Sequence, residues 1–207
     1  MCWSARVSLN TYIVALFGTI FALANGVSPQ LVLFMHWFSL IQLVEFFIWR
    51  NINNEYWNFV FSTIGIGVIF VEPLLSMSFM SPGLARNLLA AAYILFCLVL
   101  VLPQIPWRPH SIKAANGHLK WKWMPFTNSY TTKMILLIWS VFFLIPLVYA
   151  KMWQALMLGS LILLISTAAY MRGGTIASMW CWLANFAWLI LIAAVALDKC
   201  VFYCKPT

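Results

Sequence analysis

Glu72 is the residue whose type and surroundings point most directly to chemistry. It lies inside a long apolar stretch, 57–79, where an ionisable side chain is costly to keep and often serves a function. At about 100° per residue in a helix, six residues of this stretch share one face. They are Asn58, Ser62, Gly65, Ile69, Glu72 and Ser76, here called the Glu72 stripe. Pro73 cannot donate to the Ile69 carbonyl, so we expect a free acceptor beside the carboxyl group. The stripe would suit a proton or a cation, and it would equally suit a helix–helix seam in which Glu72 is protonated.

Two other stretches contribute polar faces. In 30–49 the residues that share a face are Ser39, Gln42, Glu45 and Trp49, and in 176–198 they are Ser178, Cys181, Trp182 and Asn185. Glu45 lies near the end of its stretch, which favours an ion pair with Arg50 or Arg172. The residues predicted to line a substrate pathway are Glu72, Asn58, Ser62, Gln42, Glu45 and Asn185.

Cysteine and histidine chemistry gives weaker signals. Cys2-Trp3 and Trp180-Cys181-Trp182 are predicted to face the same side of the membrane, which would allow a joint thiol site. His36 is the only histidine within an apolar stretch, and we expect it to be a hydrogen-bonded residue between helices. Zinc needs three or four protein ligands, and no catalytic motif is present. The sequence therefore predicts no metal, no cofactor and no enzymatic activity.

The composition identifies the class of protein to which these residues belong. Of 207 residues, 64% are apolar and 8% are charged, with a mean hydropathy of +0.93. A soluble domain carries about 25% charged residues because its surface faces water. A soluble enzyme, a disordered chain and a disulfide-framed secreted module are thus excluded, and a multi-pass membrane protein is predicted.

Seven apolar stretches approach the roughly 20 residues that a membrane-spanning helix needs. They are 8–25, 30–49, 57–79, 84–105, 133–150, 153–171 and 176–198. We expect an all-α, seven-helix bundle forming a single domain over 1–207. Residues 11–43 align without a gap with 132–164, which indicates either a 3+1+3 parallel repeat or chance similarity between leucine-rich helices. In the first stretch a row of small residues, including Ala15 and Gly18, favours close helix packing. The same stretch also has the pattern of a secretory signal, although a retained helix is favoured.

The basic residues predict the orientation. Eight of the twelve Lys and Arg residues fall on the side of the amino terminus, which places that terminus in the cytoplasm and the carboxyl terminus outside. The same side holds the loop 106–132, in which Trp107, Trp121 and Trp123 alternate with basic residues. This pattern predicts an interfacial loop that contacts the bilayer and its anionic headgroups. Nucleic acid is disfavoured as a partner, and a homo-oligomer is left open.

The opening Met1-Cys2-Trp3-Ser4, the Gln42…Glu45…Trp49 pattern and the Asn58…Ser62…Pro73 pattern resemble a family of uncharacterised multi-helix membrane proteins. Members of that family occur in large DNA viruses and microbial eukaryotes. The resemblance covers roughly the first 80 residues. It implies a constellation of Cys2, Trp3, Gln42, Glu45 and Asn58 on the cytoplasmic side, but no activity.

Together these observations favour a small transporter- or channel-like protein that moves a proton, a cation or a small solute. A membrane adaptor or assembly protein is the alternative, and an intramembrane lipid-modifying enzyme is the third. The first two differ in one respect: a pathway needs polar faces that line a water-accessible cavity, whereas an adaptor needs only a dry seam.

Overall fold

The computed structural model describes residues 4–123 and 130–197, with the backbone alone at 130–133. The helices are α1 (Ala5–Ala24), α2 (Pro29–Arg50), α3 (Glu55–Met77), α4 (Leu84–Phe96), α5 (Tyr130–Tyr149), α6 (Trp153–Tyr170), α7 (Ile176–Ala184) and α8 (Phe186–Ala196). α4 continues through a π-helical turn, η1 (Cys97–Val101), and a 3₁₀ turn, η2 (Leu102–Gln104). α7 and α8 follow each other with only Asn185 between them. The predicted all-α architecture with seven helical spans is confirmed.

Six of the described spans are long and apolar enough to cross a membrane. The remaining one, α5, has a shorter apolar part at Met134–Tyr149. Local sequence explains where several helices begin. The Ser4 hydroxyl accepts a hydrogen bond from the Val7 amide, the Asn54 side chain accepts one from Trp57, and Pro29 occupies the first turn of α2. The chain is therefore a multi-pass membrane protein, and α1, α2 and α3 begin at residues whose types favour a helix start.

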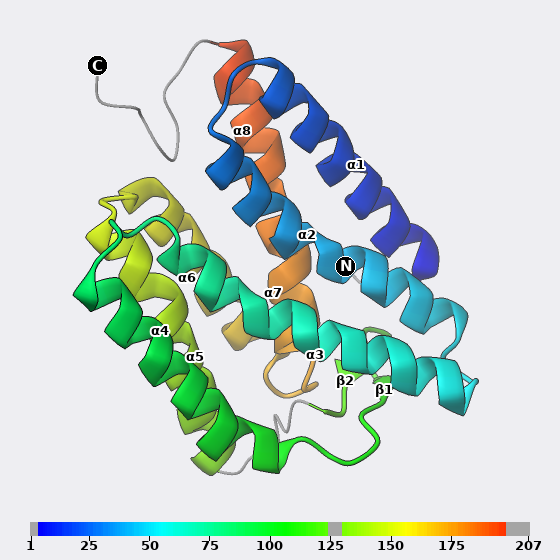
Figure 1. Ribbon diagram of the computed structural model, residues 1–207. Helices are drawn as coiled ribbons and strands as arrows, with labels where there is room; N and C mark the ends of the chain where they lie inside the picture. The colour runs from blue at the N-terminus through cyan, green and yellow to red at the C-terminus, as the bar shows by residue number, and fades with distance from the viewer. Residues whose placement is uncertain (1–3, 124–129, 198–207) are drawn as a thin grey trace.

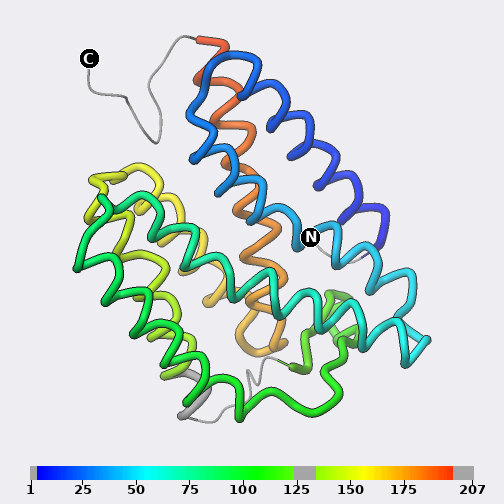
Figure 2. The backbone as a smooth tube through the Cα atoms, viewed as in Figure 1, coloured from blue at the N-terminus to red at the C-terminus, as the bar shows by residue number. Residues whose placement is uncertain are grey.

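The helices form two groups that diverge away from one end of the bundle (Figures 1 and 2). One group contains α1, α2 and α8, and the other contains α3, α4, α5 and α6. α2 packs against α3, and α7 packs against both α2 and α6, so the groups are joined where these helices meet. We call the joined end, which carries the only strands of the described structure, the hairpin end, and the opposite one the far end.

Two short strands, β1 (Ser111–Lys113) and β2 (Leu119–Trp121), form an antiparallel hairpin at this end. Ser111 pairs with Trp121, and Gly117 takes the positive φ of 82° that the turn requires. Residues 111–123, here called the hairpin, contact α3 and α7. The hairpin also reaches the α6–α7 connection, where the Asn116 amide donates to the Thr175 hydroxyl at 3.1 Å.

The hairpin overturns part of the prediction for the loop 106–132. Trp121 and Trp123 are only 2% and 1% exposed, and their rings stack with centroids 4.9 Å apart. Trp107, in contrast, is exposed. The expectation that these rings lie at the membrane interface is therefore wrong for Trp121 and Trp123, because the hairpin places them inside the bundle. Anchoring to anionic headgroups stays a prediction for the exposed part of the loop.

The first helix packs as its small residues predict. Ala15, Gly18 and Ala22 are buried, and a Cβ atom added at Gly18 would lie 2.5 Å from the Trp188 ring of α8. Glycine at this position lets the indole lie directly on the α1 backbone. The close-packing prediction is confirmed. The parallel repeat stays a prediction, since the packing of these helices does not test it.

Candidate functional site

The Glu72 stripe is a single buried face of α3. All six of its residues are buried, with Glu72 at 1% exposure. Neither carboxyl oxygen of Glu72 has a hydrogen-bond partner within the part of the chain that the structure describes. Tyr93 of α4 interacts electrostatically with Glu72, and its hydroxyl group donates to the Phe70 carbonyl at 2.9 Å. The periodicity argument for this face is thus confirmed, and Glu72 is enclosed by protein.

The hairpin end of the stripe is a closed hydrogen-bond network. The Asn58 amide nitrogen donates to the carbonyl oxygens of Ile52 and Ser111, at 3.1 and 2.9 Å. In return the Asn58 amide oxygen accepts from the Ser111 backbone N–H at 2.9 Å and from the Ser62 hydroxyl at 3.2 Å. The hydroxyl groups of Ser62 and Ser111 are 3.0 Å apart. Asn58 therefore binds the hairpin backbone as a strand would, and its side-chain amide is fully hydrogen-bonded within the protein.

Gln42 and Glu45 are both completely buried on α2. The two cations predicted to pair with Glu45, Arg50 and Arg172, are exposed. The ring of Trp123 occupies the space between α2 and α3 beside Gly65, because a Cβ atom there would lie 3.5 Å from that ring and 3.5 Å from Val44. The hairpin therefore fills the region between the polar faces of α2 and α3.

The residues predicted to form a thiol site do not share one face. Trp180 and Cys181 are buried in the bundle. Trp182 points instead to α1, where its indole N–H donates to the Thr11 hydroxyl at 3.1 Å. Cys2 and Trp3 lie outside the described residues. Asn185, also predicted to line the pathway, donates its amide hydrogen to the Cys181 carbonyl at 2.7 Å, beside the break between α7 and α8.

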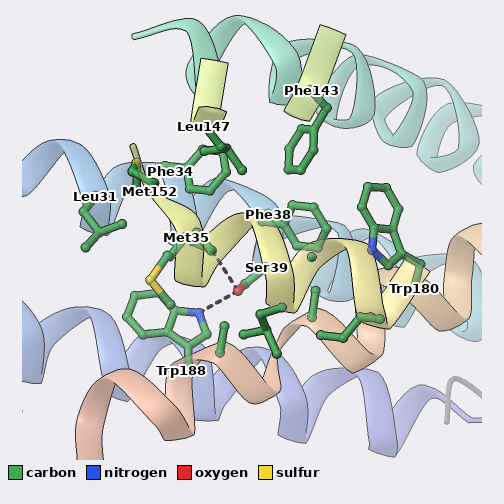
Figure 3. A pocket seen from close by; sticks show the side chains of 16 residues that line it. Leu31, Phe34, Met35, Phe38, Ser39, Phe143, Leu147, Met152, Trp180 and Trp188 are labelled. Atoms are coloured by element: carbon green, nitrogen blue, oxygen red, sulfur yellow. Dashed lines mark hydrogen bonds between the residues drawn. The ribbon is translucent and has the colours of Figure 1, made fainter. Parts of the chain in front are cut away.

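The structure contains a crevice that the sequence did not predict. It lies between α2 on one side and α5, α6, α7 and α8 on the others (Figure 3). The crevice is partly open to its surroundings and has a cavity volume of about 80 Å³. The lining residues are Leu31, Phe34, Met35, Phe38, Ser39, Phe143, Leu147, Met152, Ala155, Leu158, Gly159, Ile162, Trp180, Ala184, Ala187 and Trp188. The crevice extends from Leu31 and Met152, beside the far-end connections, to Phe38 and Trp180 in the middle of the bundle.

Three aromatic rings form the inner end of the crevice. Phe38, Phe143 and Trp180 contact one another with ring centroids 5.5 to 6.1 Å apart, and we call them the aromatic floor. Figure 3 shows the three side chains converging from α2, α5 and α7. Edge-to-face contacts of this kind stabilise a packed arrangement without hydrogen bonds. The floor therefore separates the crevice from the hairpin half of the bundle.

Aromatic packing continues from the floor to the hairpin. Trp139 stacks on Phe143 at 5.5 Å, and beyond it a gap of about 10 Å³ is lined by Trp121, Trp139, Trp180 and Cys181 among others. The indole N–H groups of Trp121, Trp123 and Trp180 are buried and have no hydrogen-bond partner among residues 4–123 and 134–197. Ring contacts, rather than hydrogen bonds from these indoles, hold this column of side chains together.

A second cavity, of about 620 Å³, lies at the hairpin end. Its lining includes Asn53, Glu55 and Tyr56 from the start of α3, together with Arg108 and His110 from the segment before β1. Asn58 and Ser111 also border it, so the closed network separates this cavity from the interior. The lining of this cavity shares no residue with that of the crevice.

His36 forms a hydrogen bond between helices, as predicted, since its Nδ1 lies 2.8 Å from the Thr19 hydroxyl of α1. Within the described ranges no three His, Cys, Asp or Glu side chains come together as metal ligands would. His118 packs edge-to-face on Tyr170, and its partial burial lowers the pKa of the imidazole below the ordinary 6.5. Burial therefore favours the neutral form of this imidazole.

Comparison with known proteins adds no further assignment. No family model, curated protein or solved structure matches the chain. The resemblance in the first 80 residues to the viral and microbial membrane-protein family therefore stays a prediction.

Proposed function

We propose that the protein is a small carrier-type membrane transporter, and that the conformation described above is open only at its far end. The observation that carries the proposal is the crevice, whose lining runs from Leu31 and Met152 beside the far-end connections to the aromatic floor in mid-bundle. Carriers bind their substrate near the middle of the membrane and expose it to one side at a time. A half-depth crevice is the shape that such a cycle requires.

The hairpin closes the protein at the hairpin end, opposite the far end. It lies between the floor and the hairpin-end surface, with Trp121 and Trp123 buried and Ser111 bound to Asn58. Irregular and non-helical backbone is tolerated at membrane depth where it is enclosed by protein. With the predicted orientation, the hairpin end faces the cytoplasm and the crevice opens to the outside.

The helix break beside the crevice also favours a carrier. Ala184 and Ala187, which flank the junction of α7 and α8, both line the crevice. Interrupted helices at mid-depth are typical of transporter binding sites. The pathway predicted from the sequence is revised accordingly: Asn58 and Ser62 hold the hairpin, and the crevice takes the place of the polar stripe as the binding space.

The Asn58 network is equally compatible with the adaptor alternative, because a scaffold needs only polar groups that are hydrogen-bonded between packed elements. The two functions differ in whether the hairpin end ever opens. Cys181 is suited to test this, because its buried thiol lies beside Trp121 in the gap under the hairpin. A carrier must expose that gap during its cycle.

The test uses a variant in which Cys2, Cys97, Cys200 and Cys204 are replaced by Ser or Ala, so that Cys181 alone remains. The variant is reconstituted in vesicles and treated from the hairpin side with a membrane-impermeant maleimide. A second variant carries Ala155→Cys in the crevice with Cys181→Ala, and it is labelled from the far side. We expect both thiols to react, each from its own side.

A third variant, which keeps Cys181 and also carries Ala155→Cys, tests whether the two sides are coupled. Modification of the introduced crevice thiol by a bulky reagent should slow the reaction of Cys181, because a carrier whose crevice is held open keeps its hairpin end closed. A Cys181 that reacts only when the protein unfolds would support the adaptor.

A further inference from the structure

The lining of the crevice determines what it can bind. Apart from Ser39 and the indoles of Trp180 and Trp188, the lining residues are apolar. The Trp188 N–H donates to the Ser39 hydroxyl at 2.8 Å, and that hydroxyl donates to the Met35 carbonyl at 3.0 Å (Figure 3). Both groups are therefore already satisfied within the wall. An ion or a hydrophilic solute would lose its hydration in this space and gain at most one donor, the indole N–H of Trp180, which has no hydrogen-bond partner among residues 4–123 and 134–197.

The shape of the crevice is that of a slot. Its lining residues on α2 run from Leu31 to Ser39, which corresponds to about 12 Å along the helix axis. Four residues with little or no side chain leave the slot open: Ala155, Gly159, Ala184 and Ala187. At Gly159 a Cβ atom would meet no other atom within 4 Å. The cavity volume of about 80 Å³ is small beside the roughly 300–1,000 Å³ of drug-sized sites, so the slot can take only a narrow ligand.

The surroundings of the slot identify its occupant. All of its lining helices lie within the membrane-spanning part of the chain, where the solvent is lipid hydrocarbon. An apolar cavity does not hold water stably, whereas a flexible chain of methylene groups can fill an irregular slot and gain contacts along it. We propose that the crevice binds one acyl chain of a membrane phospholipid, with the chain end against the aromatic floor and the headgroup beyond Leu31 and Met152 at the far end.

The inference rests on the proposed carrier and narrows its substrate to an amphipathic lipid. The inference assigns different roles to the slot and to Glu72. The slot binds the chain, whereas Glu72 is not among the residues that line the slot. A cation or a proton is thus not the molecule that this crevice recognises.

The experiment uses two phosphatidylcholine probes in vesicles, one with a photoactivatable diazirine at the acyl terminus and one with it near the ester. After illumination of the reconstituted full-length protein, the labelled residues are mapped by mass spectrometry. The terminal probe should label Phe38 and Trp180, and the ester-proximal probe should label Leu31 and Met152. Labelling confined to outward-facing residues such as Leu33, Leu161 and Leu164 would overturn the proposal.

Matched glycine variants provide the control. Gly159→Leu fills the slot, whereas Gly67→Leu adds the same side chain on an exposed face of α3 where a Cβ likewise meets no atom within 4 Å. We expect Gly159→Leu to reduce labelling of the floor at least about tenfold, corresponding to about 1.4 kcal/mol, and Gly67→Leu to leave it unchanged. Ala155→Leu, which narrows the mouth, serves as a second blocking variant if Gly159→Leu does not fold.

Two further outcomes have distinct meanings. Equal labelling of the floor in the wild type and in both blocking variants would show that the slot does not hold the acyl chain. Labelling of the floor by a diazirine fatty acid, but not by the phospholipid probe, would show that a membrane phospholipid is not the ligand. Either result would overturn the acyl-chain proposal and leave the carrier intact, provided that Cys181 still reacts from the hairpin side. Loss of that reaction alone would instead count against the carrier.

Discussion

Asn58→Ala is the substitution that tests the role of the hairpin most sharply. The Asn58 side chain makes two hydrogen bonds to the Ser111 backbone and a third to the Ile52 carbonyl. Alanine would leave the N–H and the C=O of Ser111 buried without these partners, and Ser111 is 1% exposed. An unsatisfied buried group costs about 1–3 kcal/mol, so two of them weaken hairpin docking by about 2–6 kcal/mol. Even a loss of about 2 kcal/mol would raise the population of the undocked hairpin about 30-fold.

The assay is the rate at which an impermeant maleimide reacts with Cys181 in the single-cysteine protein. We expect the rate in Asn58→Ala to rise by at least the same factor of about 30, as long as hairpin opening precedes labelling. Asn51→Ala is the matched control, because the Asn51 amide only donates to the Phe47 carbonyl at the exposed end of α2. A wild-type labelling rate in Asn58→Ala would refute the reasoning, since it would mean that the Asn58 network does not hold the hairpin.

Three other predictions concern packing, pH and the buried carboxyl group. Gly18→Leu should lower the thermal unfolding temperature, because its Cβ would lie 2.5 Å from Trp188 and overpacking costs about 1–3 kcal/mol, whereas Gly67→Leu should leave it unchanged. An equal shift in both variants would contradict the close approach of α1 and α8. The pKa of His118 is lowered by burial in the docked hairpin, so the undocked state binds more protons near pH 6 and docking is strongest above about pH 6.5. After correction for intrinsic exchange, hydrogen exchange of the hairpin amides should accelerate as the pH falls below 6.5, and His118→Gln should remove this pH dependence. Exchange rates in the wild type that do not change with pH would contradict this prediction. Glu72→Met should change the free energy of unfolding by less than about 1.5 kcal/mol, since neither carboxyl oxygen has a hydrogen-bond partner in the described structure. A loss of about 3 kcal/mol or more in denaturant titrations would show that Glu72 has a partner that stabilises the fold.

The sequence predicted those features that depend on a single helix. The stretches of apolar residues located the seven spans, because the bilayer fixes the length of a crossing. The helical period placed Asn58, Ser62 and Glu72 on one face, and that face is buried throughout. The small residues around Gly18 predicted a close helix contact, which Trp188 makes. Each of these inferences needs only local geometry.

The hairpin was missed, although its sequence carried a signal. Leu119, Trp121 and Trp123 are buried and alternate with Lys120 and Lys122, the period of two that is typical of a strand. The same residues also fit an interfacial loop, because a membrane surface attracts basic and aromatic side chains. Strands of three residues are too short for periodicity to separate the two interpretations.

The crevice could not have been predicted from one sequence, because it arises from the divergence of two groups of helices. Its floor brings together Phe38, Phe143 and Trp180 from three helices, and nothing in the spacing of those residues relates them. The small residues Ala155, Gly159, Ala184 and Ala187 were the available signal, but such residues also mark close helix packing. Only the arrangement of the helices distinguishes a filled seam from an open slot.

The central claim is that the hairpin leaves and re-enters the bundle while the crevice closes and opens. The most direct measurement is the distance distribution between spin labels on Ala115, in the hairpin turn, and Thr63, on the exposed face of α3, in the reconstituted protein. We expect two distances, with the longer one favoured by Asn58→Ala and the shorter one favoured by excess phospholipid whose chain fills the crevice. A single distance that neither Asn58→Ala nor lipid changes would contradict the central claim.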